Sequence, residues 1–146
     1  MVDESHRIAL GAQLVQLLWA MPGSTGRVRP GYLSWQAAFT PTTRSATYTV
    51  RVSYRAGESR PEVMVVSPPL VARGDGQPIP HVFPRNRPCL HLPGEWTSDM
   101  WMHQTVIPWV SEWLFFYELW LATGSWMGRG HDGAKPSTAE VVPGAA

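Results

Sequence analysis

Hydrophobic positions follow a helical period in the first part of the chain. Between Asp3 and Met21 apolar residues return every three or four positions, which predicts an amphipathic helix. The side chain of Asp3 or Ser5 is suited to cap the start of this helix, and Pro22-Gly23 is expected to end it. The apolar positions are Ile8, Leu10, Leu14, Val15, Leu17, Leu18 and Trp19.

Three later stretches have the composition or alternation of β-strands. Residues 32–39 are rich in apolar and aromatic side chains, and residues 46–54 alternate between apolar and polar positions. Residues 62–66 form a third such run. The connections at 40–44 and 56–58 are short, which favours neighbouring antiparallel strands over crossovers. We therefore predict a β-meander of three or four strands.

A proline-rich segment separates the strands from the next helical pattern. Prolines remove backbone donors, so residues 67–96 are predicted to form a long, stiff, structured loop. Loops of this length in a compact domain are usually functional, and this one holds the only cysteine, Cys89, and two of the five histidines. The prolines are Pro68, Pro69, Pro78, Pro80, Pro84, Pro88 and Pro93.

A tryptophan-rich helix is predicted near the C-terminus. Residues 97–99, with the sequence Thr-Ser-Asp, are suited to cap it, and its main body covers residues 109–121. Pro108 is expected either to start that body or to kink it, and Gly124 to stop it. Most of the tryptophans at 96, 101, 109, 113 and 120 are expected to fill the core, and any aromatic excess at the surface to mark a protein partner.

These elements predict an α+β architecture with one domain over residues 1–128 and a flexible tail over 129–146. The chain has 146 residues and a formal charge of +1, without the dense basic stripe that nucleic acid requires. We expect no nucleic acid partner. The most apolar stretch, residues 106–122, contains a proline and two glutamates, which argues against a membrane span. With no secretory signal pattern and one cysteine, the cytoplasm is the expected location.

Several motifs around Cys89 occur in a particular order. His81 and Asn86 precede the Cys89-Leu90 pair, and Trp96 follows just before the predicted helix. This order resembles the active-site segment of ubiquitin-conjugating enzymes, in which a His-Pro-Asn element, a cysteine followed by leucine, and a tryptophan follow the last strand. The chain departs from that family because His81 and Asn86 do not form a contiguous triplet.

Further motifs resemble the bacterial branch of this superfamily that occurs in CBASS antiphage operons. In those operons the gene of this branch lies beside the gene of a cyclic-oligonucleotide synthase, which is a cGAS-like nucleotidyltransferase. The similarity covers roughly residues 5–131. The motifs are Pro80-His81, Pro88-Cys89-Leu90-His91, Pro93-Gly94, Ile107-Pro108-Trp109, Glu112-Trp113-Leu114, Tyr117-Glu118-Leu119-Trp120 and Thr123-Gly124-Ser125-Trp126.

The resemblance implies a ubiquitin-conjugating fold and a cysteine-dependent acyl transferase. Cys89 would form a thioester with the C-terminal carboxyl of a protein, in particular the cGAS-like nucleotidyltransferase, and so regulate antiphage cyclic-nucleotide signalling. No activating domain is expected in this chain, so a separate activating enzyme is a further partner unless the system lacks one. The final acceptor of the acyl group stays open.

The residue chemistry agrees with this expectation and also leaves alternatives. A thiolate is a good nucleophile, Arg85 and Arg87 are suited to lower its pKa, and Asn86 or a backbone amide is suited to support an oxyanion. His81 and His91 are candidates for a general base or for orienting groups, or they bind loop carbonyls.

Other functions fit the same residues. A non-catalytic binding module on this fold is one alternative, and a cysteine isopeptidase that pairs Cys89 with His91 or His103 is another. Neither a cofactor nor a metal is expected, because the spacing of Cys89 and the histidines lacks a paired metal-ligand motif.

Overall fold

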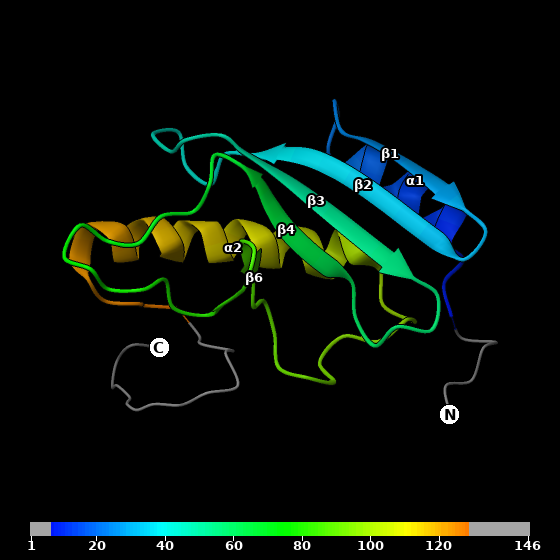
Figure 1. Cartoon of the computed structure of the whole chain (residues 1–146). Coiled ribbons are helices and arrows are strands. Elements are labelled where there is room, and N and C mark those ends of the chain that lie inside the picture. The colour runs from blue at the N-terminus through cyan, green and yellow to red at the C-terminus, as the bar shows by residue number, and fades with distance from the viewer. Residues whose placement is uncertain (1–6, 129–146) are drawn as a thin grey trace.

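The computed structural model describes residues 7–128 and has the predicted α+β organisation (Figure 1). An N-terminal helix is followed by a four-stranded sheet, a long connection with a small hairpin, and a C-terminal helix that runs across one face of the sheet. The elements are α1 (Leu10–Ala20), β1 (Thr25–Arg29), β2 (Tyr32–Phe39), β3 (Tyr48–Arg55), β4 (Glu62–Ser67), β5 (Val82–Phe83), β6 (Arg87–Pro88) and α2 (Met102–Thr123).

The sheet is an antiparallel meander in which each strand pairs with the next one in sequence. The three predicted strands are confirmed as β2, β3 and β4. The sheet has four strands, within the predicted three or four, but the residues of β1 were not assigned to a strand, because all five are exposed and show no apolar alternation. Strand β1 pairs with β2 across the Pro30-Gly31 turn, and the positive φ of Gly31 suits a tight reversal.

The core lies between the inner face of the sheet and α2. Alternate residues of β2 and β3 are buried, as a strand with one solvated face requires, and they meet the buried side of α2. Trp96, Trp113 and Trp120 are buried there, whereas Trp101 and Trp109 are half-buried. The prediction that most of these tryptophans fill the core is confirmed for those three.

The helix starts differ from the predictions. Helix α1 begins at Leu10 with Ala9 as its N-cap residue and no capping side chain, and the candidate caps Asp3 and Ser5 lie outside the described residues. Helix α2 begins at Met102 with no capping side chain at Trp101, so the predicted capping by residues 97–99 is wrong.

Buried Gln13 of α1 supplies the missing cap of α2. Its Oε1 accepts a hydrogen bond from the Met102 N–H at 2.9 Å, and its Nε2 donates to the Met100 carbonyl at 2.9 Å. Thus a side chain from another helix satisfies an N–H group that has no partner within α2.

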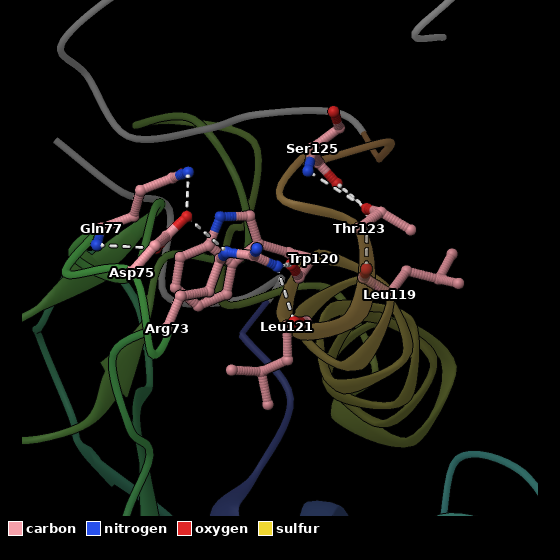
Figure 2. Close-up of polar contacts among 8 residues, drawn as sticks. All are labelled: Arg73, Asp75, Gln77, Leu119, Trp120, Leu121, Thr123 and Ser125. Carbon is pink, nitrogen blue, oxygen red and sulfur yellow. Dashed lines mark hydrogen bonds and ion pairs between the residues drawn. The ribbon is translucent and has the colours of Figure 1, made fainter.

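The C-terminal half of α2 is anchored by the loop that follows β4. Pro108 lies inside α2, so it does not start the helix, while Gly124 ends it with a positive φ and an N–H bond to the Trp120 carbonyl, as predicted. Figure 2 shows Arg73 reaching from the loop to this end of the helix. Its Nη1 donates to the carbonyls of Trp120 and Leu121 at 2.9 and 2.6 Å, where a cation is favoured by the helix dipole.

Residues 129–146 lie outside the described part of the chain, so the division into a domain over 1–128 and a tail over 129–146 stays a prediction. Gly128, the last described residue, has no room for a side chain. A Cβ there would lie 2.3 Å from the Phe116 ring, which indicates close packing of this residue on α2.

Candidate active site

The candidate residues surround a short hairpin in the connection between β4 and α2. Strands β5 and β6 pair with each other, and residues 84–86 form the turn between them. Arg85 and Asn86 have φ values of 65° and 58°, and His81, just before β5, has a φ of 54°. Left-handed backbone is costly for residues other than glycine, so three such residues indicate a hairpin conformation imposed by its surroundings.

The unusual backbone of His81 presents its carbonyl to two donors. The Cys89 N–H donates to this oxygen at 2.9 Å, and Nε1 of Trp113 on α2 donates to it at 3.0 Å. The His81 ring contacts Trp126, with ring centroids 5.0 Å apart. His81 therefore holds Cys89 in place through its main chain and links the cysteine loop to α2.

The thiol of Cys89 lies inside its own loop. Its Sγ donates to the His91 carbonyl over 3.9 Å, a long contact even for sulfur, and the residue is 6% exposed. Cys89 is not part of the hydrophobic cluster between the sheet and α2. The thiol is thus buried near the surface rather than in the main core.

The neutral ring of His91 is held in one tautomer by its surroundings. His91 is 6% exposed, its ring packs against Trp109 at a centroid distance of 5.1 Å, and its Nδ1 lies 2.8 Å from the Leu92 carbonyl. A carbonyl oxygen only accepts, so Nδ1 carries the hydrogen and the lone pair of the neutral ring is on Nε2. An imidazole oriented in this way is equipped to accept a proton.

The main chain of Asn86 bonds to the sheet and not to the other three candidates. Its carbonyl accepts a hydrogen bond from the Val65 N–H of β4 at 2.8 Å, which docks the hairpin on the sheet. The structure therefore links Cys89 to the carbonyl of His81 through its backbone N–H and to the carbonyl of His91 through its thiol, whereas the described bond of Asn86 goes to β4. His103, the other candidate partner of the thiol, packs its ring against Trp101 on α2.

A cleft of about 300 Å³ adjoins the cysteine loop. Pro88 and Leu90, the two neighbours of Cys89 in sequence, line it together with His91. The opposite wall comes from the β3–β4 turn and the start of β4, and Phe83 of β5 closes one side. The remaining lining residues are Glu58, Ser59, Arg60, Pro61, Glu62, Val63 and Arg87.

The arginines near Cys89 have other partners in or near this cleft. Nη1 of Arg87 lies 2.5 Å from a carboxylate oxygen of Glu62, and its Nε donates to the Pro84 carbonyl at 2.8 Å. The guanidinium of Arg60 lies 4.8 Å from the centre of the Phe83 ring. The positive charge of Arg87 is thus paired with the carboxylate of Glu62.

Two further features were searched for in the described part of the chain. No group of three or more His, Cys, Asp and Glu side chains within residues 7–128 is arranged to hold a metal ion. Among the helices of the same region, none has both the length and the apolarity needed to cross a membrane.

The fold and site define a helix–meander–helix domain with a cysteine-bearing connection. Residues 13–133 match the family described as Type II CBASS E2 protein, so the chain belongs to that family. This confirms the resemblance drawn from the motifs around Cys89. Family membership indicates a conjugating-enzyme-like transferase that acts together with other CBASS proteins. A comparison with curated protein sequences gives no match.

Sequence reasoning missed the parts of the site that come from distant segments. Trp113 was predicted only as a core residue, yet its indole N–H binds the His81 carbonyl. Arg60 was not considered, and the turn at 56–58 was predicted only as a connection between strands, because a short polar turn carries no signal for the cleft that it lines. The tryptophans predicted to be buried carried one usable signal for this contact, because a buried indole N–H needs a hydrogen-bond acceptor.

Proposed function

We propose that this protein is a ubiquitin-conjugating-like transferase that forms a thioester between Cys89 and the C-terminal carboxyl of a cGAS-like nucleotidyltransferase. In this role it regulates antiphage cyclic-nucleotide signalling in the cytoplasm. The carrying observation is the position of Cys89. The residue with the only thiol of the chain donates its backbone N–H to the His81 carbonyl and its Sγ to the His91 carbonyl, and its sequence neighbours line a cleft.

The proposed reaction has two steps. The Cys89 thiolate attacks the activated carboxyl carbon of the donor, so that a carbon–sulfur bond forms, the activating group leaves and the thiol proton passes to solvent. In the second step an amine attacks the thioester, a carbon–nitrogen bond forms and Cys89 leaves as the thiolate. The activating group is an adenylate or another thioester supplied by a separate partner.

We assign His91 to the second step. An amine must lose a proton as it attacks, and the Nε2 of His91 carries the lone pair that accepts it, because Nδ1 is occupied by the Leu92 carbonyl. His81 is a positioning residue that acts through its carbonyl. Asn86 or a backbone amide of the loop supports the oxyanion.

The test is to incubate the protein with the nucleotidyltransferase of its own operon, with and without the operon's activating enzyme and ATP. A covalent adduct that is removed by dithiothreitol is expected, and Cys89→Ala should abolish it. Cys89→Ser should give an adduct that resists dithiothreitol, because an ester replaces the thioester. An adduct that persists in Cys89→Ala would contradict the role of this thiol.

The assignment of His91 has a separate readout. His91→Gln should slow discharge of the preformed thioester to an amine by about tenfold to a hundredfold and leave loading within about twofold. Equal losses in both steps would show that His91 only supports the loop.

The burial of Cys89 favours one second candidate, a partner-binding module without catalysis. A residue that is 6% exposed and donates its thiol hydrogen to a carbonyl is protected from reagents. Iodoacetamide labelling separates the two functions. Labelling of the native protein at a rate within about tenfold of the urea-unfolded chain supports the transferase, and an inert native thiol supports the binding module.

A further inference from the structure

One wall of the cleft beside Cys89 is the outer edge of the four-stranded sheet. Strand β4 is the last strand of that sheet, so its outer side has no strand partner within it. In an antiparallel pair, residues whose N–H and C=O point to the neighbour alternate with residues whose groups point away. The Val65 N–H donates to the Asn86 carbonyl instead of to β3, so Val65 belongs to the outward-pointing set.

Val63 belongs to the same set. It precedes Val65 by two positions, and the register between β3 and β4 is regular over this part of the strand. Its N–H and C=O therefore point to the outer edge, and Val63 lines the cleft. Within residues 7–128 no backbone group beyond the sheet bonds to the Val63 main chain. The hairpin bonds to β4 at Val65, so the main-chain N–H and C=O of buried Val63 have no backbone partner beyond the sheet within the described residues.

The other walls of the cleft indicate the chemistry of its ligand. Two acidic residues, Glu58 and Glu62, are balanced by two basic ones, Arg60 and Arg87, so the cleft does not select a strongly charged molecule. Apolar rings and side chains of Pro61, Phe83, Pro88 and Leu90 provide the rest of the lining. A volume of about 300 Å³ is at the lower end for ligand pockets. These properties fit a short, extended polypeptide segment.

We propose that this cleft binds the C-terminal segment of the acyl donor as an added strand on the edge of β4. The inference rests on the proposed function, because the donor's last carbon must reach Cys89. Pro88 and Leu90 line the cleft on both sides of that residue, so a segment paired with Val63 ends at the cysteine loop. Recognition through main-chain hydrogen bonds provides affinity with little demand on the donor's side chains.

The experiment removes the Val63 N–H by a backbone ester, which also makes the Glu62 carbonyl a weaker acceptor. α-Hydroxyisovaleric acid in place of Val63 keeps the buried side chain and the carbonyl, and replaces the N–H by an ester oxygen. This N–H lies outside the β3–β4 ladder, so the fold should be retained, which urea unfolding checks. The probe is the last seven residues of the operon's nucleotidyltransferase, labelled with fluorescein and carrying a C-terminal mercaptoethanesulfonate thioester.

Loading of the probe needs no activating enzyme. The Cys89 sulfur attacks the thioester carbonyl, a new carbon–sulfur bond forms, the old one breaks, and mercaptoethanesulfonate leaves with the proton of the Cys89 thiol. For the backbone-ester variant, the probe concentration at half-maximal rate should rise by about threefold to tenfold, the effect of one lost hydrogen bond. The maximal rate should stay within about twofold, and exchange of the Val63 amide in the unsubstituted protein should slow after loading.

A matched probe separates this inference from the proposed function. S-acetyl mercaptoethanesulfonate has the same leaving group and no peptide, so it should load both proteins at equal rates. An unchanged half-maximal concentration of the peptide probe in the ester variant would contradict pairing at Val63. Loading of the acetyl probe without saturable loading of the peptide would also contradict it. Failure of the unsubstituted protein to react with either probe would instead contradict the role of Cys89.

Discussion

Replacing Gln13 by alanine is expected to be among the most destabilising changes outside the hydrophobic core. Gln13 is 2% exposed, and its amide joins α1 to the start of α2 through two hydrogen bonds of 2.9 Å. The partners are the carbonyl of Met100 and the N–H of Met102. The substitution removes both bonds at once, so the buried N–H of Met102 and the partly buried carbonyl of Met100 are left without this partner.

The size of the effect follows from these two bonds. A typical intramolecular hydrogen bond contributes about 0.5–1.5 kcal/mol net, and a buried polar group left without a partner costs about 1–3 kcal/mol. We expect Gln13→Ala to lower the free energy of unfolding by about 2–4 kcal/mol, including the cavity. Gln13→Met fills the same space without the amide, so it should retain most of this loss.

Urea unfolding followed by tryptophan fluorescence measures the change. For a slope of about 2 kcal/mol per molar urea, the midpoint should fall by about 1–2 M. Gln16→Ala is the matched control, because Gln16 is exposed on the same helix and its loss should change stability by less than about 0.5 kcal/mol. If Gln13→Ala lowered stability no more than Gln16→Ala, the cap assigned to Gln13 would be refuted.

Three further predictions concern other parts of the structure. Arg73→Ala removes two hydrogen bonds to the end of α2 and should cost about 1–3 kcal/mol in urea unfolding, whereas exposed Arg44→Ala should change stability by less than about 0.5 kcal/mol. Burial, reinforced by a hydrogen bond to a carboxylate of α2, raises the pKa of Tyr48 above its ordinary 10.0. The unfolded chain therefore loses the Tyr48 proton at lower pH than the folded protein, and the free energy of unfolding should fall as pH rises above 10. Urea midpoints between pH 8 and 11 should fall less steeply with pH for Tyr48→Phe than for the unsubstituted protein. An equal slope for the two proteins would contradict the assignment. Gly26→Ala would place a Cβ 2.6 Å from a leucine methyl of α1 and 2.7 Å from a carbonyl of β2. The melting temperature of this variant should therefore fall by the equivalent of about 1–3 kcal/mol. Gly11→Ala is the control, because Gly11 is exposed in α1 with open space around it, and its free energy of unfolding should rise by about 0.5–1 kcal/mol.

The fold was predictable wherever neighbouring residues in the chain carry the signal. The alternation of Tyr48, Val50, Val52 and Tyr54 marks β3, because side chains of a strand point to opposite faces in turn. Strand β1 escaped prediction because its residues are exposed and its pairing with β2 supplies the order that its own sequence lacks. Helix starts were also missed, since local polar residues were expected to cap them.

The candidate site was predictable only in part. The family was recognised from motifs around Cys89 and is confirmed by the family match, whereas the role of Cys89 itself stays a prediction. The roles of the neighbours were not predictable in the same way. His81 contacts Cys89 through its main chain, and a sequence pattern reports side-chain chemistry, not the direction of a carbonyl.

By itself, the sequence determined the order of helix, meander, proline-rich connection and tryptophan-rich helix, together with the family. These features depend on residues close to each other along the chain. Only the tertiary structure decided that Gln13, 89 positions before Met102, caps α2, and that the free edge of β4 at Val63 faces the cleft beside Cys89. Hydrogen bonds between distant segments depend on how the elements pack, and no local period of polar and apolar residues encodes that packing.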